Sequence, residues 1–210
     1  MNKLFLDTLP PATSKLTTIF QAKQPTFLDQ FYLSGGTGLA LQLGHRESED
    51  LNFFNKQTFD PKKLLVELQT FGKLEGTELA SGTLNTFLNG VKLQFLEYPY
   101  QLLEKTVDWQ NIQVSSVIDI ACTKLQTVSI RGSKKDFIDI YFLLKKYPLE
   151  TLFKKSKEKY PQIDYNTAHI LKSLSYFVDA NNQPMPRMRQ SVNWKAVKEK
   201  ITQTVKNFKF

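Results

Sequence analysis

The residues best suited to chemistry are gathered in residues 31–54. Gly35, Gly36 and Thr37 follow a short apolar segment that predicts a strand, and they precede the apolar residues 39–43, which predict a helix. This order places glycine backbone and a hydroxyl at a helix N-terminus, where unpaired N–H groups and the positive end of the helix dipole favour a phosphate. The sequence therefore predicts a phosphate-binding turn.

Two oxygen-bearing side chains follow that helix at strand spacing. Asp50 and Asn52 alternate with Leu51 and Phe53, so the polar pair shares one face of the predicted strand. Carboxylate and amide oxygens can ligate a divalent cation, and the pattern predicts one half of a metal and nucleotide site. A glycine pair alone is usually a turn, and an Asp-x-Asn pair alone is often a solvated edge. The joint order carries the prediction.

A second group of charged residues lies within residues 115–146. Lys124 and Arg131 are spaced i and i+7, so they share one face of a predicted helix. Asp136 opens the following predicted helix in a Ser-x-x-Asp capping pattern, and Asp139 lies one turn further on. Spacing alone explains these residues equally well as helix caps and solvated faces.

A hairpin is predicted between the two groups. Residues 83–88 and 91–96 alternate in polarity, and they are separated by Asn89 and Gly90. This dipeptide is favoured in two-residue turns because both central positions need a positive φ. Gln94 lies on the polar face of the second predicted strand.

These blocks resemble, in the expected order, the nucleotidyltransferase superfamily and more closely its AbiEii-type abortive-infection toxins. The first block matches that family in Gly35-Gly36-Thr37, Gly44-His45-Arg46, Ser48 and residues 50–54. The second block matches it over residues 124–144, and the resemblance spans about residues 31–145.

The resemblance implies transfer of a nucleotide from a nucleoside triphosphate (NTP) to a hydroxyl of RNA, such as tRNA, or of a protein. The enzyme would be the toxin of a toxin–antitoxin or phage-defence pair, with an antitoxin as partner. The resemblance implies catalytic roles for Asp50, Asn52, Lys124, Asp136 and Asp139. It implies contacts with the nucleotide or its phosphates for Gly35, Gly36, Thr37, Arg46, Ser48, Arg131 and Lys135.

The resemblance also implies finer roles. Asp136 or Asp139 is expected either to take a proton from the acceptor hydroxyl or to order the lysine. One Mg²⁺ ion, delivered largely by the nucleotide, is expected at Asp50, with Asn52 and Gln94 as weak ligands.

Asn52 and Gln94 depart from the resemblance, which implies carboxylates at both positions. Both amides keep an oxygen, but neither carries a charge. Two unit charges 4 Å apart interact by about 4 kcal/mol at an effective dielectric near 20, so two missing charges weaken a site for a dication. Two hypotheses stay open. One is an active transferase, which the retained residues favour, and the other is a protein of the same fold that binds nucleotide, RNA or a partner protein without turnover.

Composition bounds the class of protein. The 210 residues carry a net charge of +8, which suits a polyanionic partner without requiring one. The single cysteine, Cys122, excludes an internal disulfide and favours a cytoplasmic location. No apolar run is long enough for a membrane span, and the N-terminal apolar stretch is too short for a signal peptide, so no membrane partner is expected.

We expect a mixed α/β (α+β) fold of the nucleotidyltransferase type, with a small mixed β-sheet flanked by helices and a helical C-terminal half. Residues 1–115 are predicted to form the core with N-terminal helices, and residues 116–210 a helical region packed on it. Helices of that region are predicted at residues 149–159, 165–178 and 194–208, with a loop at 179–193.

Overall fold

The computed structural model describes residues 3–163 and 166–209. Its mixed sheet has the strand order β3-β4-β5-β2-β1-β7-β6. The strands are β1 Tyr32–Ser34, β2 Leu51–Asn55, β3 Leu74–Ala80, β4 Thr83–Leu88, β5 Val91–Glu97, β6 Val107–Trp109 and β7 Ile112–Val114. The helices are α1 Pro11–Lys23, α2 Gly35–Leu43, α3 Pro61–Gln69, α4 Val117–Ile130, α5 Lys134–Lys146, α6 Leu149–Lys159, α7 Thr167–Leu174, α8 Val178–Asn181 and α9 Trp194–Lys206, and two short 3₁₀ turns, η1 Leu6–Thr8 and η2 Thr26–Gln30, flank α1.

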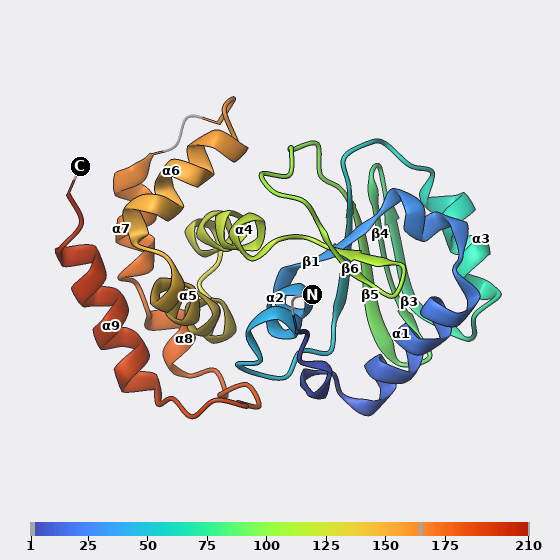
Figure 1. Cartoon of the computed structure of the whole chain (residues 1–210), viewed down its shortest axis with the longest axis horizontal. Helices are drawn as coiled ribbons and strands as arrows, with labels where there is room; N and C mark the ends of the chain where they lie inside the picture. Colours follow the sequence, from blue (N-terminus) through green and yellow to red (C-terminus); the bar gives the residue numbers. More distant parts are fainter. Residues whose placement is uncertain (1–2, 164–165, 210) are drawn as a thin grey trace.

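The sheet lies between two groups of helices (Figure 1). Helices α1 and α3 pack beside its outer part, where one apolar cluster joins them to the strands. Helices α4 to α9 fill the other half of the molecule, around a second apolar cluster. The predicted mixed α/β fold is confirmed, and the boundary between residues 115 and 116 stays a prediction.

Strand β2 places the candidate polar residues. It runs antiparallel to β1 and parallel to β5, with Asn52 paired to Gln94. Leu51 and Phe53 are fully buried in the core on the opposite face. The period of two predicted for this segment is therefore correct, and it brings the two amides side by side on the face that looks toward α4.

The predicted hairpin turn holds in detail, and an Asp-Pro pair in the sequence also marks the start of a helix. Asn89 and Gly90 adopt φ angles of 51° and 80°, and they join β4 to β5 as a two-residue hairpin. Asp60 caps α3, because its side chain accepts a hydrogen bond from the Lys62 backbone N–H at 2.9 Å. Both features depend only on adjacent residues, which is why the sequence reveals them.

The helical half departs from the prediction in two places. The helix expected at residues 165–178 is divided into α7 and α8, and its first residue, Tyr165, lies outside the described residues. The expected loop at 179–193 correspondingly begins inside α8. The break lets the Phe177 ring pack against the rings of Phe137 and Trp194, at centroid distances of 4.8 and 5.8 Å.

Helix α5 is buried on nearly every side. Its fully buried residues include Phe137, Ile138, Asp139, Ile140 and Leu143. Helices α4, α8 and α9 all contact it, so it is the central helix of this half. A charged residue such as Asp139 can occupy this position only if it is paired.

No helix in the described ranges is both long enough and apolar enough to cross a bilayer.

Candidate active site

A cavity of about 460 Å³ opens between the β2 and β5 face of the sheet, one side of α4 and the first turn of α5. The predicted site residues that line it are Gly35, Gly36, Arg46, Ser48, Asp50, Asn52, Gln94, Lys124, Arg131, Lys135 and Asp136. Residues more than 80 positions apart in the sequence thus meet around one space. Thr37 and Asp139 do not line it.

Glycines at the start of α2 leave room for two polar side chains. A Cβ atom at Gly35, whose φ is 65°, would lie 2.9 Å from Nδ2 of Asn52. A Cβ atom at Gly36 would lie 2.7 Å from Nη2 of Arg46. Both positions therefore require the absence of a side chain, because Asn52 and Arg46 press against the first turn of the helix.

Thr37 faces the protein interior. Its side chain is fully buried, and its hydroxyl donates to the backbone carbonyl of Asp50 at 2.5 Å and lies 2.9 Å from the Ser48 hydroxyl. These bonds fix the segment that carries Asp50 beneath α2. The phosphate contact predicted for Thr37 remains a prediction, and the geometry gives this residue a positioning role instead.

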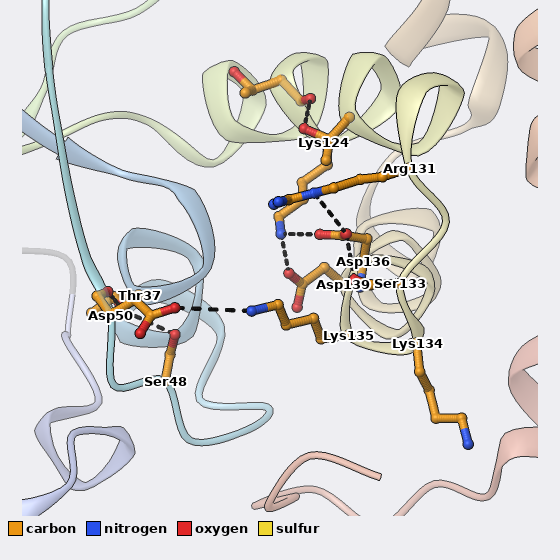
Figure 2. Close-up of polar contacts among 12 residues, drawn as sticks. Thr37, Ser48, Asp50, Lys124, Arg131, Ser133, Lys134, Lys135, Asp136 and Asp139 are labelled. Carbon is orange, nitrogen blue, oxygen red and sulfur yellow. Dashed lines mark hydrogen bonds and ion pairs between the residues drawn. The ribbon is translucent and has the colours of Figure 1, made fainter. Parts of the chain in front are cut away.

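Asp50 lies just before β2, and its carboxylate is 35% exposed to the cavity. Lys135 reaches toward it across the cavity, with Nζ 3.9 Å from Oδ2 (Figure 2). Neither amide beside it, Asn52 or Gln94, makes a side-chain hydrogen bond to any other residue in the described chain. All three polar side chains are therefore available to a ligand.

The oxygen donors do not fit a pair of metal ions held by the protein. Residues 3–163 and 166–209 contain no cluster of three or more His, Cys, Asp or Glu side chains placed to hold a metal. Asp50 contributes one charge, and Asn52 and Gln94 contribute only neutral oxygens. This donor set suits one ion that arrives with some of its own ligands, as Mg²⁺ does on a triphosphate.

Asp139 is the centre of a buried ionic network. It accepts hydrogen bonds from Nε2 of His45 at 2.8 Å and from Nε and Nη2 of Arg46 at 2.7 and 2.9 Å. Lys124 Nζ lies 2.6 Å from its second oxygen. The same ammonium group donates to Asp136 at 2.8 Å, so Lys124 bridges the two carboxylates (Figure 2).

The network keeps its groups charged. Burial pushes the pKa of Asp139 upward, but the charges of Arg46 and Lys124 outweigh burial and hold that pKa well below its usual range. Burial likewise opposes the charged form of Lys124, yet Asp139 and Asp136 raise its pKa above the ordinary value. Lys124 therefore presents a fixed positive charge to the cavity.

Asp136 and Asp139 differ in what they can reach. Asp136 lines the cavity and accepts a hydrogen bond from Ser133 at 2.5 Å, and Nε of Arg131 lies 3.8 Å from the same oxygen. Asp139 has no cavity surface, and its donors are already in place. Of the two roles expected for these carboxylates, the contacts of Asp139 suit ordering of the lysine rather than proton transfer.

The cavity is strongly cationic. The positive side chains in its lining are those of Arg46, Lys92, Lys124, Arg131 and Lys135. The carboxylates in that lining belong to Asp50 and Asp136. A cavity with this excess of positive charge attracts a polyanion such as a triphosphate.

Sequence reasoning missed several lining residues. Lys92 shares the polar face of β5 with Gln94, and this alternation was the available signal. Tyr98, Thr123 and the exposed Ile130 also line the cavity. No local pattern marks them, because only the approach of α4 to the sheet brings them there.

His45 makes the stability of the protein sensitive to mild acid. Burial lowers its pKa despite the opposing effect of Asp139, so folding favours the neutral ring. A lowered pKa in the folded state gives stability that is complete above the unfolded-state value, about 6.5, and lost as pH falls below it.

We expect the unfolding free energy to fall between pH 7 and pH 5, by at most about 1.4 kcal/mol per pH unit from this group. His45→Gln should flatten the profile, because glutamine still donates to Asp139 but does not titrate in this range. His169→Gln, at an exposed position, is the matched control. Urea unfolding at several pH values measures the slopes, and equal slopes for all three proteins would contradict the assignment.

Comparison with known proteins places the chain. Residues 18–101 and 94–209 match the family model described as nucleotidyl transferase AbiEii toxin of a type IV toxin–antitoxin system. An uncharacterised protein of Aquifex aeolicus (strain VF5) is 36% identical over 186 residues, which cover 86% of this chain and 88% of that protein.

Two solved structures from Helicobacter pylori share the fold. A putative nucleotidyltransferase superposes with a TM-score of 0.54 at 16% identity, covering 94% of each chain. JHP933 superposes with a TM-score of 0.53 at 15% identity, covering 94% of this chain and 92% of its own. The family match extends over nearly the whole sequence and includes both halves of the cavity, so this chain belongs to the AbiEii family of nucleotidyl transferase toxins.

Proposed function

We propose that this protein transfers a nucleotide from an NTP to a hydroxyl group of RNA. The observation that carries the proposal is the cationic cavity beside Asp50, in which buried Asp139 holds Arg46 and Lys124 in place. Family membership supports the transfer chemistry, and the net charge of +8 supports an RNA acceptor such as tRNA over a protein.

In this reaction the acceptor oxygen attacks the α-phosphorus in line. A new phosphorus–oxygen bond forms, the bond to the bridging oxygen breaks, and pyrophosphate leaves. We assign the proton of the acceptor hydroxyl to Asp50 rather than to Asp136 or Asp139. Asp50 is the exposed carboxylate of the cavity, whereas the other two are fully buried and paired with Lys124. Lys124, Arg131 and Lys135 neutralise the charge that develops on the phosphates.

Asp50, with the amide oxygens of Asn52 and Gln94, would hold one Mg²⁺ ion that arrives on the triphosphate. The ion supplies neutralisation of phosphate charge when it is bound. Gly35 and Gly36 leave the start of α2 open, so that its backbone N–H groups can approach a phosphate. Arg46 and Ser48 line the same side of the cavity.

A cognate antitoxin is the proposed protein partner. The description of the matching family as a toxin of a type IV toxin–antitoxin system supports it. Growth arrest on expression of the chain, relieved by the product of a neighbouring gene, is the result expected of such a pair.

Asp50→Asn is expected to lower nucleotide transfer by at least about 100-fold, because it removes the proposed proton acceptor. It should also abolish the gain in affinity that Mg²⁺ gives to NTP binding. Labelled NTP and a tRNA mixture measure transfer, and calorimetry with each NTP, with and without Mg²⁺, measures binding. Asp179→Asn, on the exposed surface of α8, is the matched control. Full activity in Asp50→Asn would remove Asp50 from the mechanism.

The amides at positions 52 and 94 favour a second candidate function. A protein that binds nucleotide or RNA without turnover would need positively charged side chains more than metal-binding carboxylates. In that case wild-type protein binds NTP by calorimetry but transfers no label to any acceptor. The two assays together therefore separate the candidates.

A further inference from the structure

A second cavity of about 530 Å³ lies at the far end of β2 from Asp50. Tyr32 and Asn55 form part of its wall, where β1 begins and β2 ends. Gln57, Tyr100 and Gln101 also line this cavity. None of these residues has a place in the proposed transfer reaction.

One buried polar group of this cavity lacks a partner among the described residues, and a second side chain uses only one of its two polar atoms. Asn55 is only 5% exposed, and its Oδ1 accepts the Gln57 backbone N–H at 2.9 Å. The Nδ2 group of Asn55 donates to no described residue. The hydroxyl of Tyr32, a residue only 9% exposed, is buried and also without a partner in the described part of the chain. Unused hydrogen-bonding groups at this depth are costly unless a ligand or water satisfies them.

A buried ion pair fixes the opposite wall. Lys159 Nζ lies 2.5 Å from Oδ1 of Asp119, and both side chains are almost fully buried. The same ammonium donates to the Gln101 carbonyl at 3.0 Å. Asp119 also accepts the backbone N–H groups of Leu103 and Glu104 at 2.9 and 3.2 Å. Asp119 therefore anchors the loop beside the cavity.

The chemistry of the lining differs from that of the first cavity. The charges of Asp29 and Lys56 balance, so the second cavity has no attraction for a polyphosphate. Apart from Leu102, its remaining groups are tyrosine rings, which can stack on flat rings, and amides, which can form paired hydrogen bonds. An uncharged, flat, hydrogen-bonding group such as a nucleobase fits this combination.

Packed aromatic rings lie between the two cavities. Phe54 and Tyr98 line the first cavity, and Tyr32 and Tyr100 line the second. The ring centroids of Tyr32 and Phe54 are 6.0 Å apart, and those of Tyr98 and Tyr100 are 4.8 Å apart. Along β2, Asn52 of the first cavity and Asn55 of the second are three steps of about 3.3 Å apart, so a few nucleotides of one strand can span them.

We propose that the second cavity binds a base of the single-stranded acceptor, upstream of the hydroxyl that receives the nucleotide. This inference rests on the proposed function for the direction of the strand. It assigns Tyr100 to stacking and the amides of Asn55 and Gln101 to hydrogen bonds with the base. A free NTP gains nothing from these residues, whereas an oligonucleotide does.

Binding of short fluorescent RNA and DNA oligonucleotides, followed by anisotropy, tests the inference. Tyr100→Leu should weaken oligonucleotide binding about 5- to 100-fold, the range for loss of one stacked base. Gln101→Ala should weaken it less, and it keeps the bond from Lys159 to the Gln101 backbone carbonyl, because the Gln101 side chain makes no hydrogen bond within residues 3–163 and 166–209. Tyr176→Leu, at an exposed tyrosine outside both cavities, is the control.

Calorimetric NTP binding by the same variants should stay within about twofold of wild type, since the first cavity is unaltered. Oligonucleotide binding that is absent in wild type, or equal in Tyr100→Leu, Gln101→Ala and the control, overturns the inference. If RNA and DNA both bind and depend on Tyr100, the site reads the base rather than the sugar. If binding depends on Tyr100 while no NTP is bound or transferred, the second cavity stands and the proposed transfer fails.

Discussion

Replacing Asp139 with asparagine should reduce the free energy of unfolding by about 3–5 kcal/mol, the usual cost of removing one partner from a buried charge pair. The carboxylate receives His45, Arg46 and Lys124 at distances of 2.6 to 2.9 Å. Asparagine keeps the size of the side chain but removes the carboxylate that Arg46 and Lys124 share, and leaves Asp136, with Asp50 near Arg46, to balance them. Denaturant unfolding followed by circular dichroism measures the loss, and Asp179→Asn is the exposed control.

The acid limb of the stability profile provides an independent check on the same residue. Folding lowers the pKa of Asp139, so its contribution is present above the unfolded-state pKa of about 3.9 and is lost as pH falls through the folded-state value. Asp139→Asn should therefore be less sensitive to acid below about pH 4 than wild type is. An unfolding free energy within about 0.5 kcal/mol of wild type at pH 7 would show that the network contributes no net stability.

Restoring two carboxylates should create a metal site that wild type lacks. Asn52→Asp combined with Gln94→Glu adds two negative charges beside Asp50 without changing side-chain size. A charge pair at 4 Å is worth roughly 4 kcal/mol, and even one third of that energy gives each added carboxylate about a tenfold gain in metal affinity. We therefore expect the double variant to bind Mn²⁺ at least about 100-fold more tightly than wild type, as measured by electron paramagnetic resonance without nucleotide.

Asn85→Asp is the matched control for this gain. Asn85, on β4, pairs with Gln94 of β5, so its substitution adds one negative charge, half that of the double variant, one strand further from Asp50. A control that gains as much affinity as the double variant would attribute the effect to net charge alone. No gain in the double variant would mean that the amides are not positioned as ligands.

These two substitution sets probe different requirements of the site. Asp139 acts from beneath the cavity by holding the cations that face it. Asn52 and Gln94 face the cavity and set how much of the charge must come from the ligand. Under the proposed function, the two sets test whether the site uses fixed cations for a polyphosphate more than protein-held metal ions.

Features set by neighbouring residues could be predicted from the sequence. The turn at Asn89 and Gly90 follows from their tolerance of positive φ, and the cap at Asp60 follows from its place before a proline. The shared face of Asp50 and Asn52 follows from the strand period. Family resemblance then gave the order of the elements, which the fold confirms.

Only the tertiary structure decided how each polar residue is used. Arg46 and Asp139 are 93 residues apart, and their pairing exists because α5 is buried against the segment that follows α2. The same packing turns Thr37 inward, places Asp139 beneath the cavity, and joins Asp119 to Lys159 beside the second cavity. Residue spacing specifies which face of one element a side chain occupies. What that face meets, and therefore whether a charge is buried, paired or free to bind a ligand, depends on the packing of distant segments.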